Sequence, residues 1–328
     1  MNALIVCHAG ERLGLGHLTR SMVVASALQE DLGATVRFLI QGDPVQRDDL
    51  AQFDHHFLGI DVNLGDKIRQ QVNLFDAQVV VLDLHPRLVP TEFDLLLKVL
   101  RQEGCRVVGV DGLILHRREL DLIFIPSFQF LKPDGLAGSA PILFGWDCFL
   151  LNVKCRPIEW EPGRQVLALA GGSDATNLGS SLPTLLNAAL PDDTKLHWVT
   201  GPFAQNPVWP LAPRFPMVNH HPPSGLDDLM LKTNYAVTVY GVSFFELLYY
   251  GVPTVVFSPY GNKDDAELAA IAAEGVALVA RNENEAVFKL NELMTDDSLA
   301  RSLSQRARQL LAVQGGKKLA QAVAALLD

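Results

Sequence analysis

A short glycine loop with a histidine and an arginine is the first part of this sequence whose residue types and spacing suit chemistry. Gly14, Gly16, His17 and Arg20 follow the apolar run at residues 3–7, and an amphipathic segment begins at His17. Glycines let a backbone approach a ligand closely, and the first amides of a helix favour phosphate or developing negative charge. Because histidine exchanges protons near neutral pH, His17 is the candidate general base. The alternative is that His17 only caps the helix.

Two further glycine turns follow apolar runs in the second half of the chain. The residues of interest are Gly172 and Ser173 in the first turn, and Gly241, Val242, Ser243 and Glu246 in the second. Helix capping is one interpretation of both, since Ser243 and Glu246 have the spacing of a capping box. The functional interpretation is that Ser243 and the nearby amides hold a diphosphate while Glu246 accepts hydrogen bonds from a ribose.

A polar loop at residues 261–267 follows another apolar run and contains Asn262 and Asp265. Because it follows a predicted strand, it belongs to the same edge of the sheet as the glycine turns, and sugar contacts are predicted there. A solvated turn is the alternative.

Short apolar runs alternate with longer amphipathic segments along almost the whole chain. The runs occupy residues 3–7, 35–40, 79–83, 106–110 and 122–125, and then 165–170, 195–199, 236–240, 254–257 and 276–279. Continuous Val, Ile and Leu runs are typical of parallel strands covered on both faces. The pattern predicts an α/β protein of two Rossmann-like, doubly wound domains, residues 1–147 and 164–328, joined by a linker at 148–163. The predicted ligand site is a cleft between the domains.

Composition excludes several classes of protein. The net charge is −10 and no block of five Lys or Arg residues occurs, which argues against nucleic acid as a partner. The longest apolar runs are far shorter than the ~18–20 residues of a transmembrane helix, and the first run is too short for a signal peptide. The four cysteines form no CxxC pair and the paired histidines alternate across a strand, so no metal site is expected. A cytoplasmic location is the simplest interpretation.

Together, the motifs resemble those of the GT-B nucleotide-sugar enzymes. Gly14-x-Gly16-His17-x-x-Arg20 is similar to the signature of the UDP-sugar hydrolase of pseudaminic acid biosynthesis and its spore-coat polysaccharide relatives. Residues 241–274 also resemble part of the glycosyltransferase that forms lipid II.

The resemblance implies two domains facing across a cleft, no metal or other cofactor, and His17 as the catalytic base. It places the nucleotide on Gly172, Ser173, His221, Gly241, Val242, Ser243 and Glu246, with His221 beside the base. It places the sugar and diphosphate on Gly14, Gly16, Arg20, Asn262 and Asp265.

Three functions are compatible with these residues. The main hypothesis is a hydrolase that cleaves the anomeric C–O bond of a UDP-activated (acetamido) sugar. The alternative is a glycosyltransferase that passes the sugar to a bacterial surface glycan or protein. The third is a non-catalytic binder, which has no need for a base at His17. In each case the partner is a nucleotide-activated sugar, and peripheral contact with a membrane is compatible with all three.

Overall fold

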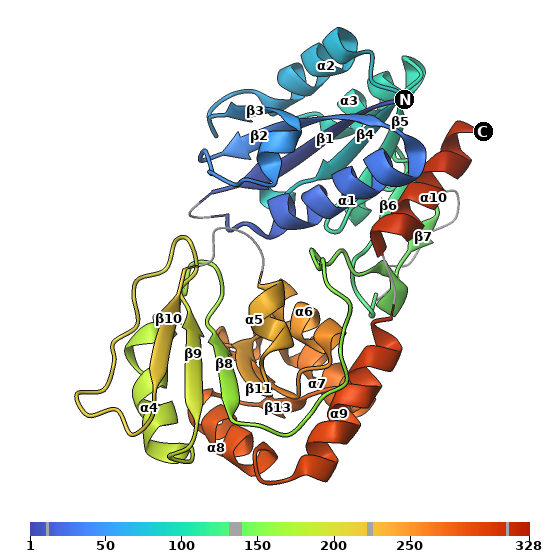
Figure 1. The fold of residues 1–328 in the computed structure, drawn as a ribbon. Helices are drawn as coiled ribbons and strands as arrows, with labels where there is room; N and C mark the ends of the chain where they lie inside the picture. Colours follow the sequence, from blue (N-terminus) through green and yellow to red (C-terminus); the bar gives the residue numbers. More distant parts are fainter. Residues whose placement is uncertain (11–12, 131–139, 222–225, 313–314) are drawn as a thin grey trace. The chain divides into compact units, whose positions relative to one another are not determined.

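The computed structural model describes residues 1–10, 13–130, 140–221, 226–312 and 315–328, which form two compact units (Figure 1). The N-terminal unit comprises Met1–Asn152 and Val313–Asp328, and the C-terminal unit comprises Val153–Ala312. Each unit contains a parallel sheet with helices on both faces. The predicted α/β class with two Rossmann-like domains is therefore confirmed.

In the part of the chain that the structure describes, the sheet of the N-terminal unit has seven strands in the order β3-β2-β1-β4-β5-β6-β7. The strands are β1 (Asn2–Ala9), β2 (Thr35–Gly42), β3 (Asp54–Leu58), β4 (Val79–Asp83), β5 (Arg106–Val110), β6 (Leu122–Phe124) and β7 (Ile142–Leu143). The apolar pattern does not predict β3 and β7, because β3 is only partly buried and β7 has two residues.

Helices cover this sheet on both faces, which explains why its central strands are apolar without alternation. The helices are α1 (Gly16–Leu32), α2 (Leu64–Phe75), α3 (Phe93–Gln102) and α10 (Gly315–Leu327), with short 3-10 turns η1 (Leu50–Gln52), η2 (Pro86–Leu88), η3 (Ile114–His116) and η4 (Trp146–Cys148). Helices α1 and α10 pack on the face that includes Ile5 and Val81, and α2 and α3 pack on the face that includes Leu4 and Val80. Helix α1 ends at Gly33, whose φ of 60° is the left-handed conformation expected of a glycine C-cap.

Helix α10 corrects the predicted domain boundaries. The sequence pattern predicts one domain at residues 164–328, but α10 belongs to the N-terminal unit and packs against α1 (Figure 1). Gly316 allows this packing, because a Cβ there would lie 3.1 Å from Cγ1 of Val23 and 3.2 Å from Cβ of Ala27, both in α1. Lys318 also forms an ion pair with Asp147 at 2.5 Å.

Among the described residues of the C-terminal unit, six strands form a sheet in the order β10-β9-β8-β11-β12-β13. The strands are β8 (Gln165–Leu169), β9 (Lys195–Val199), β10 (Met217–His220), β11 (Tyr235–Val239), β12 (Thr254–Phe257) and β13 (Leu278–Ala280). The helices are α4 (Leu182–Ala189), α5 (Asp227–Leu231), α6 (Val242–Tyr250), α7 (Asp265–Glu274), α8 (Glu283–Leu293) and α9 (Asp297–Leu310), with η5 (Leu178–Ser180) and η6 (Gly261–Asp264). Helices α4 and α8 cover one face of this sheet, and α5 and α6 cover the other.

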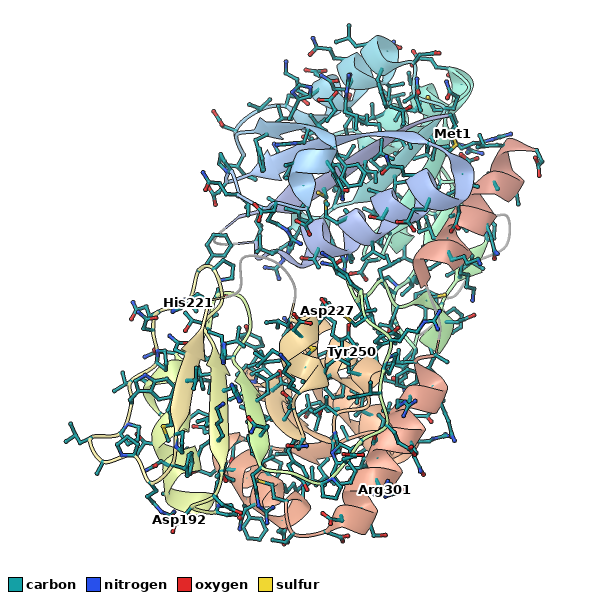
Figure 2. The ribbon with its side chains drawn as sticks, in the orientation of Figure 1. Met1, Asp192, His221, Asp227, Tyr250 and Arg301 are labelled. Atoms are coloured by element: carbon teal, nitrogen blue, oxygen red, sulfur yellow. The ribbon has the colours of Figure 1, made fainter. Side chains whose placement is uncertain are left out.

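Most of the predicted linker at 148–163 packs onto one unit or the other. Cys148 is fully buried in the N-terminal unit, and Trp160 is buried in the C-terminal unit, where its Nε1 donates to the backbone oxygen of Asn234 at 2.7 Å. The backbone N–H of Lys154 donates to Asp227 at 2.7 Å, and the Tyr250 hydroxyl donates to the same carboxylate (Figure 2). The two units therefore meet in the sequence between Asn152 and Val153, whereas the sequence predicts a separate linker over residues 148–163.

Two classes of feature are absent from the described part of the chain. None of the described helices combines the length and the apolar character needed to cross a membrane. The same residues contain no group of three or more His, Cys, Asp or Glu side chains arranged to hold a metal ion.

Candidate functional site

The histidine motif lies where the strand order of the N-terminal sheet reverses. From β1 the chain adds β2 and β3 on one side, and β4 to β7 on the other, so the switch point lies between β1 and β4. His17 follows β1 and Asp83 ends β4, and both are therefore at the carboxyl edge beside this switch point. Doubly wound sheets bind their ligands there.

His17 is held by a carboxylate rather than by the end of its helix. The N-cap of α1 is Leu15, whose side chain makes no capping hydrogen bond, and His17 lies inside the helix, so the capping interpretation of His17 is wrong. Nδ1 of His17 lies 2.6 Å from Oδ1 of Asp83, and Asp83 is only 1% exposed. A carboxylate only accepts hydrogen bonds, so this contact favours the tautomer in which Nδ1 carries the proton and Nε2 holds a lone pair that can take up another.

Arg20 also donates hydrogen bonds to the carboxylate of Asp83. Its Nε donates to Oδ2 of Asp83 at 2.6 Å and its Nη2 donates to Oδ1 at 2.7 Å, while Nη1 lies 2.8 Å from Oδ2 of Asp111. Burial raises the pKa of Asp83, but the charge and hydrogen bonds of Arg20 outweigh burial and hold that pKa below its ordinary value. Asp83 is therefore ionised at neutral pH. Contact of Arg20 with a sugar or diphosphate stays a prediction, and its guanidinium group is engaged by two carboxylates here.

Two more histidines flank the His17 ring. The ring centroids of His8 and His85 lie 6.4 and 6.3 Å from that of His17. Nδ1 of His8 accepts from the backbone N–H of His85 at 2.9 Å, so its Nε2 is the donor to Gln41, 3.3 Å away. His8 is completely buried, and burial lowers its pKa to about 4. His8 is thus a neutral structural group that fixes the backbone after β4.

This neutral histidine predicts a loss of stability in mild acid. The unfolded chain protonates His8 near its ordinary pKa of 6.5, whereas the folded protein does so only near 4. Between these values the unfolded state binds more protons, so stability falls as the pH falls. From pH 7 to pH 5 this histidine alone removes about 2 kcal/mol from the free energy of unfolding. Urea unfolding at both pH values measures it. The His8→Gln variant should lose about 2 kcal/mol less than the wild type over this interval; an equal loss in both proteins would contradict the assignment.

The glycine loop before α1 brings backbone close to this site. The N–H of Gly14 donates to the backbone oxygen of Gly10 at 2.8 Å, and Gly14 has a φ of 73°. Gly16 is exposed and begins α1. The two glycines therefore lie beside His17, and their contact with sugar or diphosphate stays a prediction.

The first glycine turn of the C-terminal unit lies at the switch point of its own sheet, between β8 and β11. Gly172 is exposed and Ser173 is half-buried. Asp174 is the capping residue of this turn, since its carboxylate accepts from the N–H groups of Leu178 and Gly179 at 2.8 Å each. Capping therefore explains Asp174 and leaves Gly172 and Ser173 without that role.

The second glycine turn lies on the other side of the same switch point. Gly241 is the N-cap of α6 and has no side chain to cap the helix, so Ser243 does not hold the N-cap position that the predicted capping box requires. The least buried face of α6 contains Val242, Ser243 and Glu246, since Phe244 and Phe245 are buried. This helix start thus keeps its first amides and two polar side chains at the carboxyl edge of the sheet.

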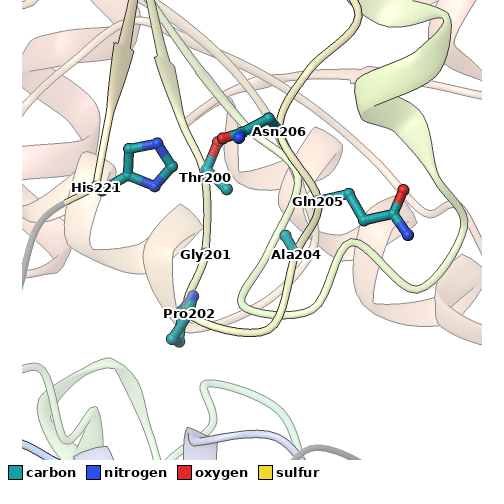
Figure 3. A pocket seen from close by; sticks show the side chains of 7 residues that line it. All are labelled: Thr200, Gly201, Pro202, Ala204, Gln205, Asn206 and His221. Atoms are coloured by element: carbon teal, nitrogen blue, oxygen red, sulfur yellow. The ribbon is translucent and has the colours of Figure 1, made fainter.

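His221 lines a pocket of ≈ 480 Å³ where β9 and β10 end (Figure 3). The pocket is lined by Thr200, Gly201, Pro202, Ala204, Gln205, Asn206 and His221. Nδ2 of Asn219 bridges two of them, since it lies 3.1 Å from Oδ1 of Asn206 and 3.0 Å from Nε2 of His221. The pocket is therefore polar and ordered by its own hydrogen bonds.

Asn262 and Asp265 are both exposed after β12. Asp264 between them accepts a hydrogen bond from Ser258, which anchors the loop. The structure places this loop at the carboxyl edge, as predicted, and its sugar contacts stay a prediction.

Comparison with known proteins identifies the fold. No protein family and no curated protein matches this sequence. Among solved structures, MurG of Acinetobacter baumannii is similar with a TM-score of 0.67 and 15% identity, over 99% of this chain and 100% of that chain. UGT2 of Phytolacca americana, in complex with UDP-2-fluoro-glucose and pterostilbene, has a TM-score of 0.67 and 14% identity over 98% and 99% of the two chains.

A third similar structure is the spinosyn rhamnosyltransferase SpnG in complex with thymidine diphosphate. Its TM-score is 0.62 at 14% identity, and both chains are covered completely. The fold is that of the GT-B glycosyltransferases. At these identities the likeness establishes the fold and leaves the chemistry to the site residues.

Proposed function

We propose that this protein is a glycosyltransferase that moves a sugar from a nucleoside diphosphate to an acceptor hydroxyl group. The observation that carries the proposal is the contact between Nδ1 of His17 and buried Asp83, which leaves Nε2 to take up a proton. A non-catalytic binder has no need for such a pair. The similar structures include transferases with bound UDP-sugar analogue or thymidine diphosphate, which supports transfer over the hydrolysis favoured by the sequence motif.

In the proposed reaction, Nε2 of His17 removes the proton from the acceptor hydroxyl as its oxygen attacks the anomeric carbon. The bond from that carbon to the diphosphate oxygen breaks, and the electron pair leaves with the nucleoside diphosphate. Asp83 stabilises the imidazolium that forms. The uncapped amides at the start of α6, with Ser243, would stabilise the charge that develops on the diphosphate. The proposal includes two expectations from the sequence: the donor is a UDP-activated sugar, and the acceptor belongs to a bacterial surface glycan or protein.

The test separates transfer, hydrolysis and simple binding. The protein is first titrated with UDP and thymidine diphosphate by calorimetry. It is then incubated with UDP-glucose, UDP-N-acetylglucosamine and a thymidine diphosphate sugar, with and without a panel of sugar and phenol acceptors, while NMR follows the anomeric proton. Acceptor-dependent consumption of a donor supports the proposal. Equally fast release of free sugar without acceptor replaces transfer by hydrolysis, and a protein that binds neither nucleotide is not a nucleotide-sugar enzyme.

A further inference from the structure

Arg20 lies close enough to His17 to affect which nitrogen of the imidazole carries the proton. Its Nη2 is 2.9 Å from Nδ1 of His17 as well as 2.7 Å from Oδ1 of Asp83. A guanidinium N–H only donates. If Nη2 donated to Nδ1, the imidazole proton would have to reside on Nε2, and His17 would be in the tautomer that cannot accept a proton from a substrate.

Asp111 holds the opposite side of the same guanidinium group. Its Oδ2 lies 2.8 Å from Nη1 of Arg20, and its side chain is 46% exposed. The guanidinium group of Arg20 therefore has a second anionic partner, bound through Nη1, while Nη2 lies next to the imidazole and Asp83. Three charged side chains, from α1 and from the ends of β4 and β5, thus form one connected hydrogen-bonded group beside His17.

The backbone of Asp111 is fixed in an uncommon conformation that makes this contact. Its φ is 62°, in the left-handed region that residues other than glycine seldom adopt. Its N–H donates to the backbone oxygen of Phe124 at 2.9 Å. Neighbouring Gly112 packs against the loop after β4, since a Cβ there would lie 2.5 Å from Cγ of Pro86. Asp111 therefore has an uncommon backbone conformation that packing holds in place beside the His17 site, which points to a role for its side chain.

We propose that Asp111 is a positioning residue that, through Arg20, sets the tautomer of His17 in which Nδ1 carries the proton and Nε2 is the base. The proposal rests on the proposed function, because it assigns His17 as the base. It adds a residue that touches neither the imidazole nor the reacting atoms.

Two substitutions of Asp111 distinguish the role of its carboxylate from the role of its backbone conformation. Asp111→Asn keeps a side chain that tolerates a left-handed conformation but removes the charge. Asp111→Gly removes the side chain and suits the left-handed backbone better than aspartate does. If Asp111 only shaped the turn, Asp111→Gly would keep full activity. If its carboxylate positions Arg20, both variants should turn over the donor about tenfold more slowly, since the loss is part of the contribution of the base. The control is Asp76→Gly, at a residue with a φ of 50° in the C-cap of α2.

The tautomer is measured directly and without turnover. Long-range 1H–15N NMR of the His17 ring should show one tautomer, with the proton on Nδ1, in the wild type and in Asp76→Gly. In Asp111→Asn and Asp111→Gly, a second population with the proton on Nε2 should appear. The same single tautomer in all four proteins would overturn the inference, as would full activity of Asp111→Gly. Absence of turnover in the wild type would instead count against the proposed function, and the ring spectra would still test the tautomer.

Discussion

Replacing His17 with alanine should reduce transfer of the sugar by about 10²- to 10⁴-fold, the usual contribution of a positioned base. The affinity for the nucleoside diphosphate should change little, because the proposed nucleotide residues belong to the C-terminal unit and His17 belongs to the N-terminal unit. Asp83 and Arg20 keep their mutual hydrogen bonds in this variant, so the fold should survive. Initial rates of nucleoside diphosphate release, together with calorimetry, separate the two effects.

The matched control for this variant is His56→Ala. His56 lies on edge strand β3 with its side chain 50% exposed, and it belongs to the same sheet. Its removal should leave the rate unchanged. An active His17→Ala protein would remove the base from the mechanism, whereas a variant that also fails to bind nucleotide would point to a wider disturbance of the structure.

The sequence predicts the general architecture because the relevant signals are local. An apolar run such as residues 79–83, without alternation, reports burial of a strand on both faces, and glycine turns report the points where strands meet helices. The sequence signal of edge strand β3 is weaker, since each of its residues is either exposed or only half-buried. The fold class is therefore predictable, while the number of strands is not.

The partner of His17 was beyond prediction, because it depends on the order of the strands. His17 and Asp83 are 66 positions apart in the sequence, and only the adjacency of β1 and β4 brings them together. The apolar run predicts the strand that ends at Asp83, but it does not predict a role for that last residue. A buried acidic residue closing an apolar strand is the signal that could have found it.

Helix α10 shows a second limit of the same kind. The apolar pattern of α10 predicts that one face of the helix is buried, but it does not predict which of the two units that face packs against. The connection from β5 to β6 contains only the short turn η3, so no crossover helix covers that part of the sheet. Leu319 and Val323 of α10 fill the place instead and join the core of the N-terminal unit.

The second large effect is expected from Glu246→Ala, which should weaken binding of the nucleoside diphosphate by about 10- to 100-fold. Two hydrogen bonds from ribose hydroxyls to a carboxylate are worth about 1.5–3 kcal/mol in total when the loss of solvation is included. Glu246 is one turn from the uncapped start of α6, on the same helix face as Ser243, so a diphosphate at the amides would place a ribose near it. Calorimetric titration with UDP measures the change. A 2′,3′-dideoxy analogue of UDP should bind wild type and variant equally.

Glu292→Ala is the control for net charge, since it removes one acidic side chain from an exposed position of α8. Each variant removes one negative charge, so an electrostatic effect on an anionic ligand would strengthen binding in both rather than weaken it. A loss specific to Glu246→Ala that disappears with the dideoxy analogue can only come from the hydroxyl groups. Unchanged affinity for UDP would exclude Glu246 from the nucleotide site. The α6 amides and the turn at Gly172 would then remain as the binding elements, because neither depends on that side chain.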